Sequence, residues 1–524
     1  MMRITHDAER TCCLGPFRPP TGPARGWLVD GGGSTGHVAS DCCVDGDRAG
    51  GVRCDPPEPE ADVSIQRFTM ETRLPVGADE AFAWHTRPGA FERLLPPWQR
   101  VEVVERTGGI RDGDRVTLRV RAGPLPVRWI LEHRDYVEGW QFRDVQVSGP
   151  FRRWEHTHEF IPVAGGECLL RDHIECELPF GVVGRFLGRH LGRDLARLFT
   201  YRHRTTHDDL ELHATCRDHR RLVVAVSGAS GLIGRGLCAL LTTGGHHVVR
   251  LVRRSPAAPD EIRWDPVTGV AAADRLDGID AVVHLAGENI AAGRWTQRRR
   301  ETLRRSRVEA TRALVRSLAA LSRPPRAFLC ASAVGIYGDR GDEVLDEDNV
   351  LWNARGFLPA VCRAWETQAA AAGRMGMRWV GLRFGVVLSP AGGMLARLLP
   401  VFKLGLGGPV GSGRQYVSWI SIDDAMGAIY HALMNKHLTG PVNVVAPHAV
   451  TNTELTASLA RVLRRPAVLR VPGWTARLAL GQMADEAILC STRAVPAVLT
   501  RTGYRFRHPE LEDALRHLLG AATE

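Results

Sequence analysis

Hydrophobic and polar positions follow three patterns along the chain. Residues 1–62 show no sustained apolar period. Residues 64–215 contain short segments in which apolar and polar residues alternate, which is typical of antiparallel strands. In residues 221–520, continuous apolar runs alternate with amphipathic stretches, an order typical of a parallel sheet covered by helices. We therefore predict an α/β domain with a doubly wound parallel sheet, preceded by an α+β domain and a leader.

Residues 1–62 are rich in glycine, proline and cysteine. Such a segment cannot bury enough apolar surface to offset the entropy lost on ordering, so we predict a disordered leader. The alternative is a translation start placed too far upstream, because the fold-like pattern begins only near Val63.

Residues 64–215 are predicted to form a sheet closed by one long helix. A strand over 65–73 is followed by a helical stretch over 81–94 that ends at Pro96 and Pro97. The long helix carries apolar residues from Val182 to Phe199 at helical spacing, and a sheet curved around it leaves a cavity. The other predicted strands are Val101–Glu105, Asp114–Arg121, Val127–Val137, Trp140–Val147, Arg153–Ile161 and Cys168–Glu177.

Three stretches in this region carry a family resemblance: FAWHTRPGAFERLLPPW, GPFRRWEHTHEF and LPFGVVGRFLGRHLGRDLARLFTYRH. They resemble the SRPBCC superfamily (START-like, polyketide-cyclase-like), whose helix-grip fold the order of elements also matches over roughly 65–213. The resemblance implies an apolar ligand in a cavity, but no particular ligand and few shared catalytic residues.

Four arginines repeat every four residues on the closing helix, namely Arg185, Arg189, Arg193 and Arg197. We interpret this stripe as a solvated outer face. The weaker alternative is a surface for anionic lipid or nucleic acid. Because no stacking aromatics or base-reading motif accompany the stripe, no nucleic-acid partner is expected.

A glycine-rich turn opens the second domain, in RLVVAVSGASGLIGRGLCALL. Gly228, Gly231 and Gly234 follow a continuous apolar strand and begin an amphipathic helix, with a second strand after it. Glycines at this spacing permit a tight turn, close approach to a pyrophosphate and close packing of helix on strand. The context predicts a dinucleotide site, with helix amides facing the phosphates.

The end of the second strand indicates which dinucleotide binds. An NAD site normally has an acidic residue there to hold the ribose hydroxyls. This chain has Arg250, Arg253 and Arg254 instead, and no acid before Asp260. Arginines suit the 2′-phosphate, so we predict NADP (NADPH) as the cofactor, the alternative being that they only reflect the arginine excess of the whole chain.

Further stretches, among them HLAGENIAAGRWT, SRVEATRALV and LLPVFKLGLGGPVGSGRQYVSWI, resemble the extended short-chain dehydrogenase/reductases and their uncharacterised "epimerase family" subgroup. The resemblance covers nearly all of 221–520. It implies a Rossmann domain with a small C-terminal substrate lobe from about 390, and a segment over 390–420 that covers the substrate. The residues placed at the cofactor are Gly228, Ser230, Gly231, Leu232, Ile233, Gly234, Arg250, Arg253, Arg254, Ala286, Gly287 and Arg383.

The Tyr-x-x-x-Lys dyad of that family is absent from the chain. There are only two lysines, Lys403 and Lys436, and neither stands four residues after any of the six tyrosines. By spacing, Phe357 and Val361 occupy the dyad positions, and Arg307 replaces the active-site asparagine.

Three interpretations stay open: an oxidoreductase or isomerase with other acid/base residues, a reductase whose proton comes from water or substrate, and a protein that binds NADP as a sensor without chemistry. The polar residues predicted near the nicotinamide are Ser332, Tyr337, Glu288 and Arg307. The predicted substrate contacts are Arg414, Gln415 and Trp419.

Composition limits the other possibilities. The 524 residues carry a net charge of +10, with 66 arginines among 68 basic residues, which we attribute mainly to codon bias. The 12 cysteines include no zinc-type spacing, so we predict no metal site. No apolar run is long enough to cross a membrane and no secretory signal is visible, so we expect a cytoplasmic protein.

Overall fold

The computed structural model describes residues 65–122, 125–179, 181–216, 219–270, 272–350 and 353–521. The predicted leader over 1–62 lies outside these residues. The described residues form one compact unit, in which an α+β domain precedes an α/β domain. The predicted helix-grip and Rossmann folds are both confirmed.

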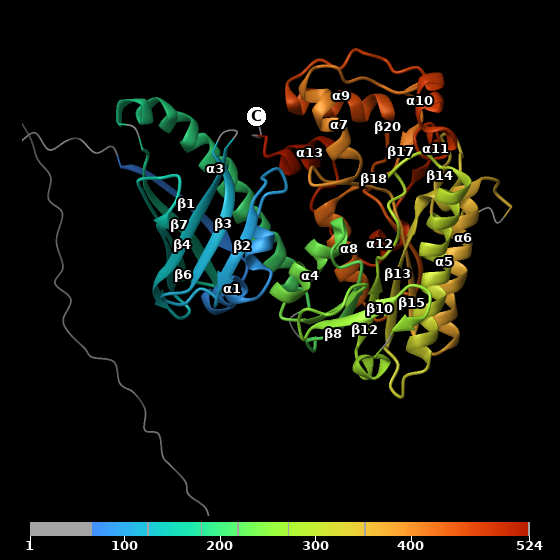
Figure 1. Cartoon of the computed structure of the whole chain (residues 1–524), viewed down its shortest axis with the longest axis horizontal. Coiled ribbons are helices and arrows are strands. Elements are labelled where there is room, and N and C mark those ends of the chain that lie inside the picture. Colours follow the sequence, from blue (N-terminus) through green and yellow to red (C-terminus); the bar gives the residue numbers. More distant parts are fainter. Residues whose placement is uncertain are drawn as a thin grey trace, which may run out of the picture. The chain divides into compact units, whose positions relative to one another are not determined.

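The first domain is a seven-stranded antiparallel sheet with strand order β1-β7-β6-β5-β4-β3-β2 (Figure 1). Inward residues of its strands alternate with outward ones, and Leu195 and Phe199 of the long helix α3 pack in the same core as inward Trp154 and Ile174. Its elements are β1 Gln66–Leu74, α1 Ala78–Thr86, α2 Ala90–Leu94, β2 Glu102–Thr107, β3 Arg115–Ala122, β4 Leu125–Val137, β5 Gln141–Ser148, β6 Arg153–Val163, β7 Glu167–Glu177 and α3 Gly181–Ala214.

The predicted strands match the observed ones to within a few residues, but the single helix expected over 81–94 is wrong. Two helices, α1 and α2, occupy this stretch. The break falls at Pro88 and Gly89, where proline cannot continue the hydrogen-bond ladder and Gly89 adopts φ +96°.

The second domain is built on an eight-stranded sheet of order β11-β10-β9-β8-β12-β13-β15-β19, parallel except for β11. Helices α5 and α6 lie side by side on one face, and α4 packs with α8 on the other (Figure 1). Strands β9 to β11 extend the sheet on one side of β8, and strands β12, β13, β15 and β19 extend it on the other side. The point between β8 and β12 where the strand order switches is where such folds bind ligands. The sheet and its helices are β8 Val223–Ser227, α4 Leu232–Thr243, β9 His247–Val252, β10 Glu261–Asp265, β11 Gly269–Val270, β12 Ala281–His284, α5 Gln297–Ala319, β13 Ala327–Ala333, α6 Phe357–Arg374, β15 Arg378–Phe384, α8 Ile422–Met434 and β19 Gly440–Val444.

Short elements complete this domain, and those after about residue 390 make up the predicted C-terminal lobe. The short strands among them join in two-stranded pairings. They are the 3₁₀ turns Ala273–Leu276 and Val334–Tyr337, β14 Val344–Leu345, β16 Val386–Leu388, α7 Gly393–Lys403, β17 Tyr416–Val417, β18 Trp419–Ser421, β20 Val450–Thr451, α9 Asn452–Leu463, α10 Gly473–Leu480, α11 Gln482–Ala487, β21 Arg493–Ala494, α12 Ala497–Arg501 and α13 Leu511–Leu519.

Buried ion pairs connect helices of the two folds. Arg93 of α2 binds Asp209 of α3 at 2.7 Å and Asp423 of α8 at 3.1 Å. Arg507 binds Asp209 at 2.9 Å. Burial alone would raise the pKa of Asp209, but Arg93 and Arg507 hold it below its usual value, so this carboxylate stays ionised.

Candidate functional site

The glycine-rich turn lies between β8 and α4, at the carboxyl edge of the parallel sheet. Gly228 adopts φ +72°, and a Cβ atom there would lie 2.9 Å from the backbone nitrogen of Ala286. A Cβ on Gly234 would lie 2.2 Å from the carbonyl oxygen of Gly228. Both positions therefore exclude any side chain, and the turn after β8 contacts the turn after β12. This is the cradle that a dinucleotide pyrophosphate requires.

The first turn of α4 is open to a phosphate. Gly231 caps the helix without a side-chain hydrogen bond, and Gly231 and Ser230 are exposed. Leu232 and Ile233 are half-buried, and a Cβ on Gly392 would lie 3.2 Å from Leu232 Cδ1. The segment that begins α7 therefore lies beside the glycine-rich turn.

The three arginines near the end of β9 have different surroundings. Arg250 donates to Asp260 at 3.0 and 3.1 Å, and Arg254 donates to Glu261 at 2.7 and 2.6 Å. Arg254, with the Ala257 amide, holds the pKa of Glu261 at about 2. Arg253, between them, is exposed. Two of the three predicted phosphate contacts are thus already paired with carboxylates.

Gly287 and Glu288 follow β12 and meet α5. Arg307 of α5 donates to the carbonyl oxygen of Glu288 at 3.0 Å, and its guanidinium lies 5.2 Å from the centroid of the Trp365 ring. Burial lowers the pKa of Arg307. The Glu288 carboxylate binds Arg299 at 3.1 Å. The structure therefore brings Gly287, Glu288 and Arg307 together beside the turn that carries Ala286.

Ser332, Tyr337 and Arg383 meet in a second, buried group. Arg383 donates to both oxygens of Glu366 at 2.9 Å and to the Tyr337 hydroxyl at 3.1 Å. Ser332 donates to Glu366 at 2.7 Å, and Tyr337 donates to Asn443 at 2.7 Å. Burial, against the opposing effect of Arg383, raises the pKa of Tyr337 to about 12. The hydroxyl therefore keeps its proton at neutral pH and holds neighbouring chain segments together.

The positions expected to hold the catalytic dyad are apolar. Phe357 begins α6, and its ring lies 5.2 Å from that of Trp295, while Val361 is buried. Trp295 packs with Ile290, Leu480 and Met483 in one apolar cluster that Phe357 joins. Hydrophobic packing thus replaces the proton-transfer pair.

The predicted substrate residues lie in the C-terminal lobe. Arg414 is exposed. Gln415 is buried and donates to the carbonyl oxygen of Val410 at 2.9 Å. Trp419 is fully buried and donates to the carbonyl oxygen of His448 at 2.9 Å. Gln415 and Trp419 therefore hold the lobe together, which leaves Arg414 as the exposed side chain of the three.

The first domain encloses a cavity of about 980 Å³, the size of sites that bind drug-sized ligands. The walls are mainly apolar and aromatic, with Trp129, Trp154 and Phe199 among them. Arg202, from α3, also lines it. The cavity expected from the helix-grip resemblance is present.

Polar side chains at one part of the cavity wall were not singled out from the sequence. Asp144, His156 and His158 line it, and Asp172 lies behind the two histidines. Burial alone lowers the pKa of His158, but Asp172 and Asp144 raise it to about 9. The alternation of His156 and His158 on one strand was the signal available in the sequence.

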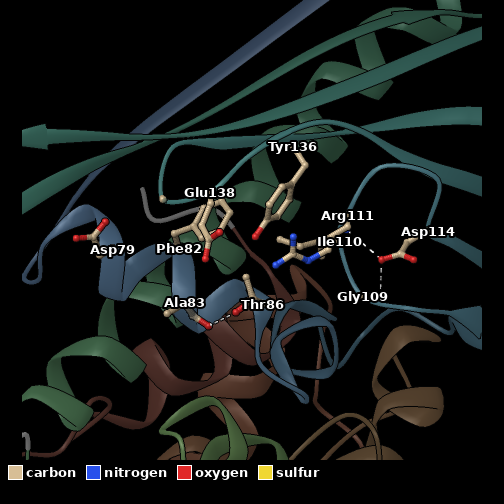
Figure 2. Close-up of a pocket in the computed structure, with 11 residues that line it drawn as sticks. Asp79, Phe82, Ala83, Thr86, Gly109, Ile110, Arg111, Asp114, Tyr136 and Glu138 are labelled. Atoms are coloured by element: carbon tan, nitrogen blue, oxygen red, sulfur yellow. Dashed lines mark hydrogen bonds between the residues drawn. The ribbon is translucent and has the colours of Figure 1, made fainter. Parts of the chain in front are cut away.

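A second, smaller pocket of about 450 Å³ lies between α1 and the loops that join β2 to β3 and β4 to β5 (Figure 2). The guanidinium of Arg111 lies 4.9 Å from the centroid of the Tyr136 ring. Asp114 accepts from the amides of Gly109 and Arg111 at 2.7 and 3.0 Å. Because these polar groups already contact one another, we assign no ligand to this pocket.

The arginine stripe of α3 is described only in part, because the side chains of Arg185 and Arg189 lie outside the described residues. Arg193 is exposed. The guanidinium of Arg197 lies 4.8 Å from the Trp98 ring centroid and donates to the carbonyl oxygen of Leu519. Arg197 thus has a structural contact within the chain. Within the described residues, no helix is long and apolar enough to cross a membrane.

Comparisons with known proteins agree with both folds. The model of the NAD dependent epimerase/dehydratase family matches residues 224–445, and that of polyketide cyclase/dehydrase and lipid transport matches 74–200. A domain of unknown function matches 471–518. The fold and the glycine-rich turn thus define a nicotinamide-dinucleotide-binding protein of the extended short-chain dehydrogenase/reductase type.

Similarity to individual proteins shows which family within this class the chain belongs to. Epimerase family protein Mb2239 of Mycobacterium bovis is 44% identical over 293 residues, which span 56% of this chain and 96% of that protein. The chain belongs to this family of epimerase family proteins, with a polyketide-cyclase-like domain at its N-terminal side.

Two solved structures are similar. A nucleoside-diphosphate sugar epimerase of Corynebacterium glutamicum is 34% identical, with a TM-score of 0.72, and the match covers 86% of this chain and 90% of that chain. Human epimerase family protein SDR39U1 (isoform 2) with NADPH is 34% identical, with a TM-score of 0.53, over 57% of this chain and 99% of that chain.

Proposed function

We propose that the α/β domain is an NADP-dependent oxidoreductase or epimerase-like enzyme that acts on a lipophilic small molecule. The observation that carries the proposal is the backbone cradle at Gly228 and Gly234, where even one Cβ atom would meet backbone. Arg253 is exposed near the end of β9 and is the arginine best placed to bind the 2′-phosphate. The human relative whose structure holds NADPH supports the same cofactor.

NADPH supplies a hydride when it is bound. The residues proposed to act on the substrate are Ser332, Tyr337, Glu288 and Arg307. Arg307 stays protonated, so it can orient an anionic oxygen but cannot accept a proton. Tyr337 is a hydrogen-bond donor rather than a base, since its pKa is raised to about 12. We therefore propose that the reaction takes its proton from water or from the substrate.

The helix-grip domain is proposed to bind or present an apolar molecule for the α/β domain. Support comes from the mainly apolar cavity of about 980 Å³. Native mass spectrometry of the protein purified from its host tests this. An apolar small molecule that copurifies with the protein supports the proposal. If no small molecule copurifies, and none binds when lipids are added to the purified protein, the proposal is wrong.

A second candidate function is that of a non-catalytic NADP-responsive protein. The observation that favours it is the engagement of Ser332 and Tyr337 with Glu366 and Asn443 in a buried network. Incubation of the protein with NADPH and a library of carbonyl and enone compounds, followed by NADPH absorbance, separates the two. If turnover appears and Tyr337→Phe with Ser332→Ala leaves it unchanged, the proposed site residues are wrong.

Arg253→Glu is expected to weaken NADPH binding by roughly 10–100-fold, because a charge-assisted hydrogen bond contributes about 1.5–3 kcal/mol. The affinity for NADH should change much less, because NADH has no 2′-phosphate for Arg253 to contact. Fluorescence titration of both nucleotides measures this. Arg465→Glu, at an exposed arginine after α9, makes the same charge change and should leave both affinities as they are. Equal losses for NADPH and NADH would contradict the phosphate contact.

A further inference from the structure

The register of the helix-grip sheet places nitrogen and oxygen ligands side by side. His156 and His158 alternate on β6, so both point into the cavity. Asp144 of β5 is the cross-strand partner of His156, and His133 of β4 is the partner of Asp144. Asp172 of β7 is the partner of His158. Four neighbouring strands therefore contribute to one polar group on a mainly apolar wall.

One ligand atom each of Asp144, His156 and His158 lies within 4.8 Å of the other two, and two of the separations are too long for a direct hydrogen bond. His156 Nδ1 and His158 Nε2 each lie 3.6 Å from Asp144 Oδ2. A hydrogen bond would bring them to about 3 Å. Ligands of one tetrahedral ion lie about 3.4 Å apart when each metal–ligand distance is about 2.1 Å. The observed separations match the edges of a coordination polyhedron.

A second group lies on the far side of each ligand, and for His156 the contact with Asp172 is a hydrogen bond. Asp172 Oδ1 lies 3.1 Å from His156 Nε2 and 2.6 Å from His158 Nδ1. Asp144 Oδ1 lies 2.7 Å from His133 Nδ1. Histidines that bind metals typically donate their other ring nitrogen to a carboxylate, which fixes the ring and raises its basicity. The shell behind the three atoms thus has the composition of a metal site.

We propose that Asp144, His156 and His158 bind one divalent transition-metal ion at the cavity wall of the helix-grip domain. Two imidazoles and one carboxylate form the ligand set of catalytic zinc and non-haem iron(II) sites, which keep positions open. Here the open positions face the mainly apolar cavity, where they would take an oxygen atom of a lipophilic ligand. This departs from the absence of a metal predicted from the cysteine spacing.

The other groups of metal-binding residues in the described chain are less suited. One contains Asp423, which Arg93 already neutralises at 3.1 Å. The other lies on one helix, with Glu211 exposed. Among these groups in the described residues, the one on β5 and β6 has a supporting carboxylate and lines the large cavity.

Titration of the chelator-treated full chain with Co²⁺ tests the proposal. One Co²⁺ per chain should bind with visible ligand-field bands, and Zn²⁺ should displace it. His158→Gln and His156→Gln are expected to weaken binding by at least about 100-fold, and Asp172→Asn by about 10–100-fold. His173→Gln removes a histidine from the outward face of β7 and should bind Co²⁺ as the parent does. Circular dichroism establishes that each variant is folded.

X-ray absorption of the Zn²⁺-loaded parent gives a result that does not depend on any variant. Two imidazoles and otherwise oxygen neighbours are expected, with no sulfur. Sulfur scattering, or failure of the parent to bind either Co²⁺ or Zn²⁺, overturns the proposal. So does a folded His158→Gln variant that binds as tightly as the parent, in which case the group is only a hydrogen-bonded network of the core.

Discussion

Gly228→Ala is expected to weaken NADPH binding by roughly 30–150-fold, equivalent to about 2–3 kcal/mol of strain in a packed site. The new Cβ would lie 2.9 Å from the nitrogen of Ala286 and 2.9 Å from the carbonyl carbon of Leu285. Both atoms belong to the backbone after β12 and cannot rotate away. The turn that cradles the pyrophosphate must therefore move. Fluorescence titration with NADPH measures the loss.

The control for this variant separates steric exclusion from backbone strain. Gly376→Ala changes a glycine at φ +82° in the turn before β15, where a Cβ would meet nothing within 4 Å. Both variants carry the cost of about 1–2 kcal/mol for a left-handed non-glycine residue. Only Gly228→Ala should lose NADPH affinity. If both variants bind NADPH equally well, the cradle at Gly228 is not the cofactor site.

Arg383→Met is expected to lower the free energy of unfolding by about 3–5 kcal/mol, because it leaves the buried Glu366 carboxylate without its cation. Arg383 is 3% exposed and Glu366 is 6% exposed, and two hydrogen bonds of 2.9 Å join them. Urea denaturation followed by circular dichroism measures the change. The further change Glu366→Leu, which removes the unpaired charge, should recover part of the loss.

An exposed pair provides the comparison for Arg383. Arg477 binds Asp485 at 2.7 Å, with both side chains more than half exposed. Arg477→Met should therefore change stability by no more than about 1 kcal/mol. The sequence led us to place Arg383 at the cofactor. A variant Arg383→Met that is as stable as the parent but has lost NADPH binding would support that placement over the structural role.

Much of the α/β domain could be predicted from local sequence. An apolar strand, three glycines at fixed spacing and an amphipathic helix specify a turn that only glycine can form, and Gly228 and Gly234 prove to be those positions. The absence of the dyad was equally predictable, because neither of the chain's two lysines lies four residues after a tyrosine. These features depend on residues close together in the chain.

The roles of individual polar residues could not be predicted in this way. Three arginines lie within five residues near the end of β9, yet Glu261, which comes later in the chain, pairs with Arg254. Tyr337 was predicted near the nicotinamide, yet it contacts Asn443 and Arg383, which lie on strands far along the sequence. Which partner neutralises a charge depends on distances that only the folded chain sets.

By itself, the sequence determined the two folds and the cofactor cradle, because hydrophobic periodicity and glycine spacing act over a few residues. It also determined that the usual proton-transfer pair is absent. Only the tertiary structure decided which polar residues meet. Asp144, His156 and Asp172 lie on three different strands, and strand register, which depends on the packing of the whole sheet, brings them to one part of the cavity wall.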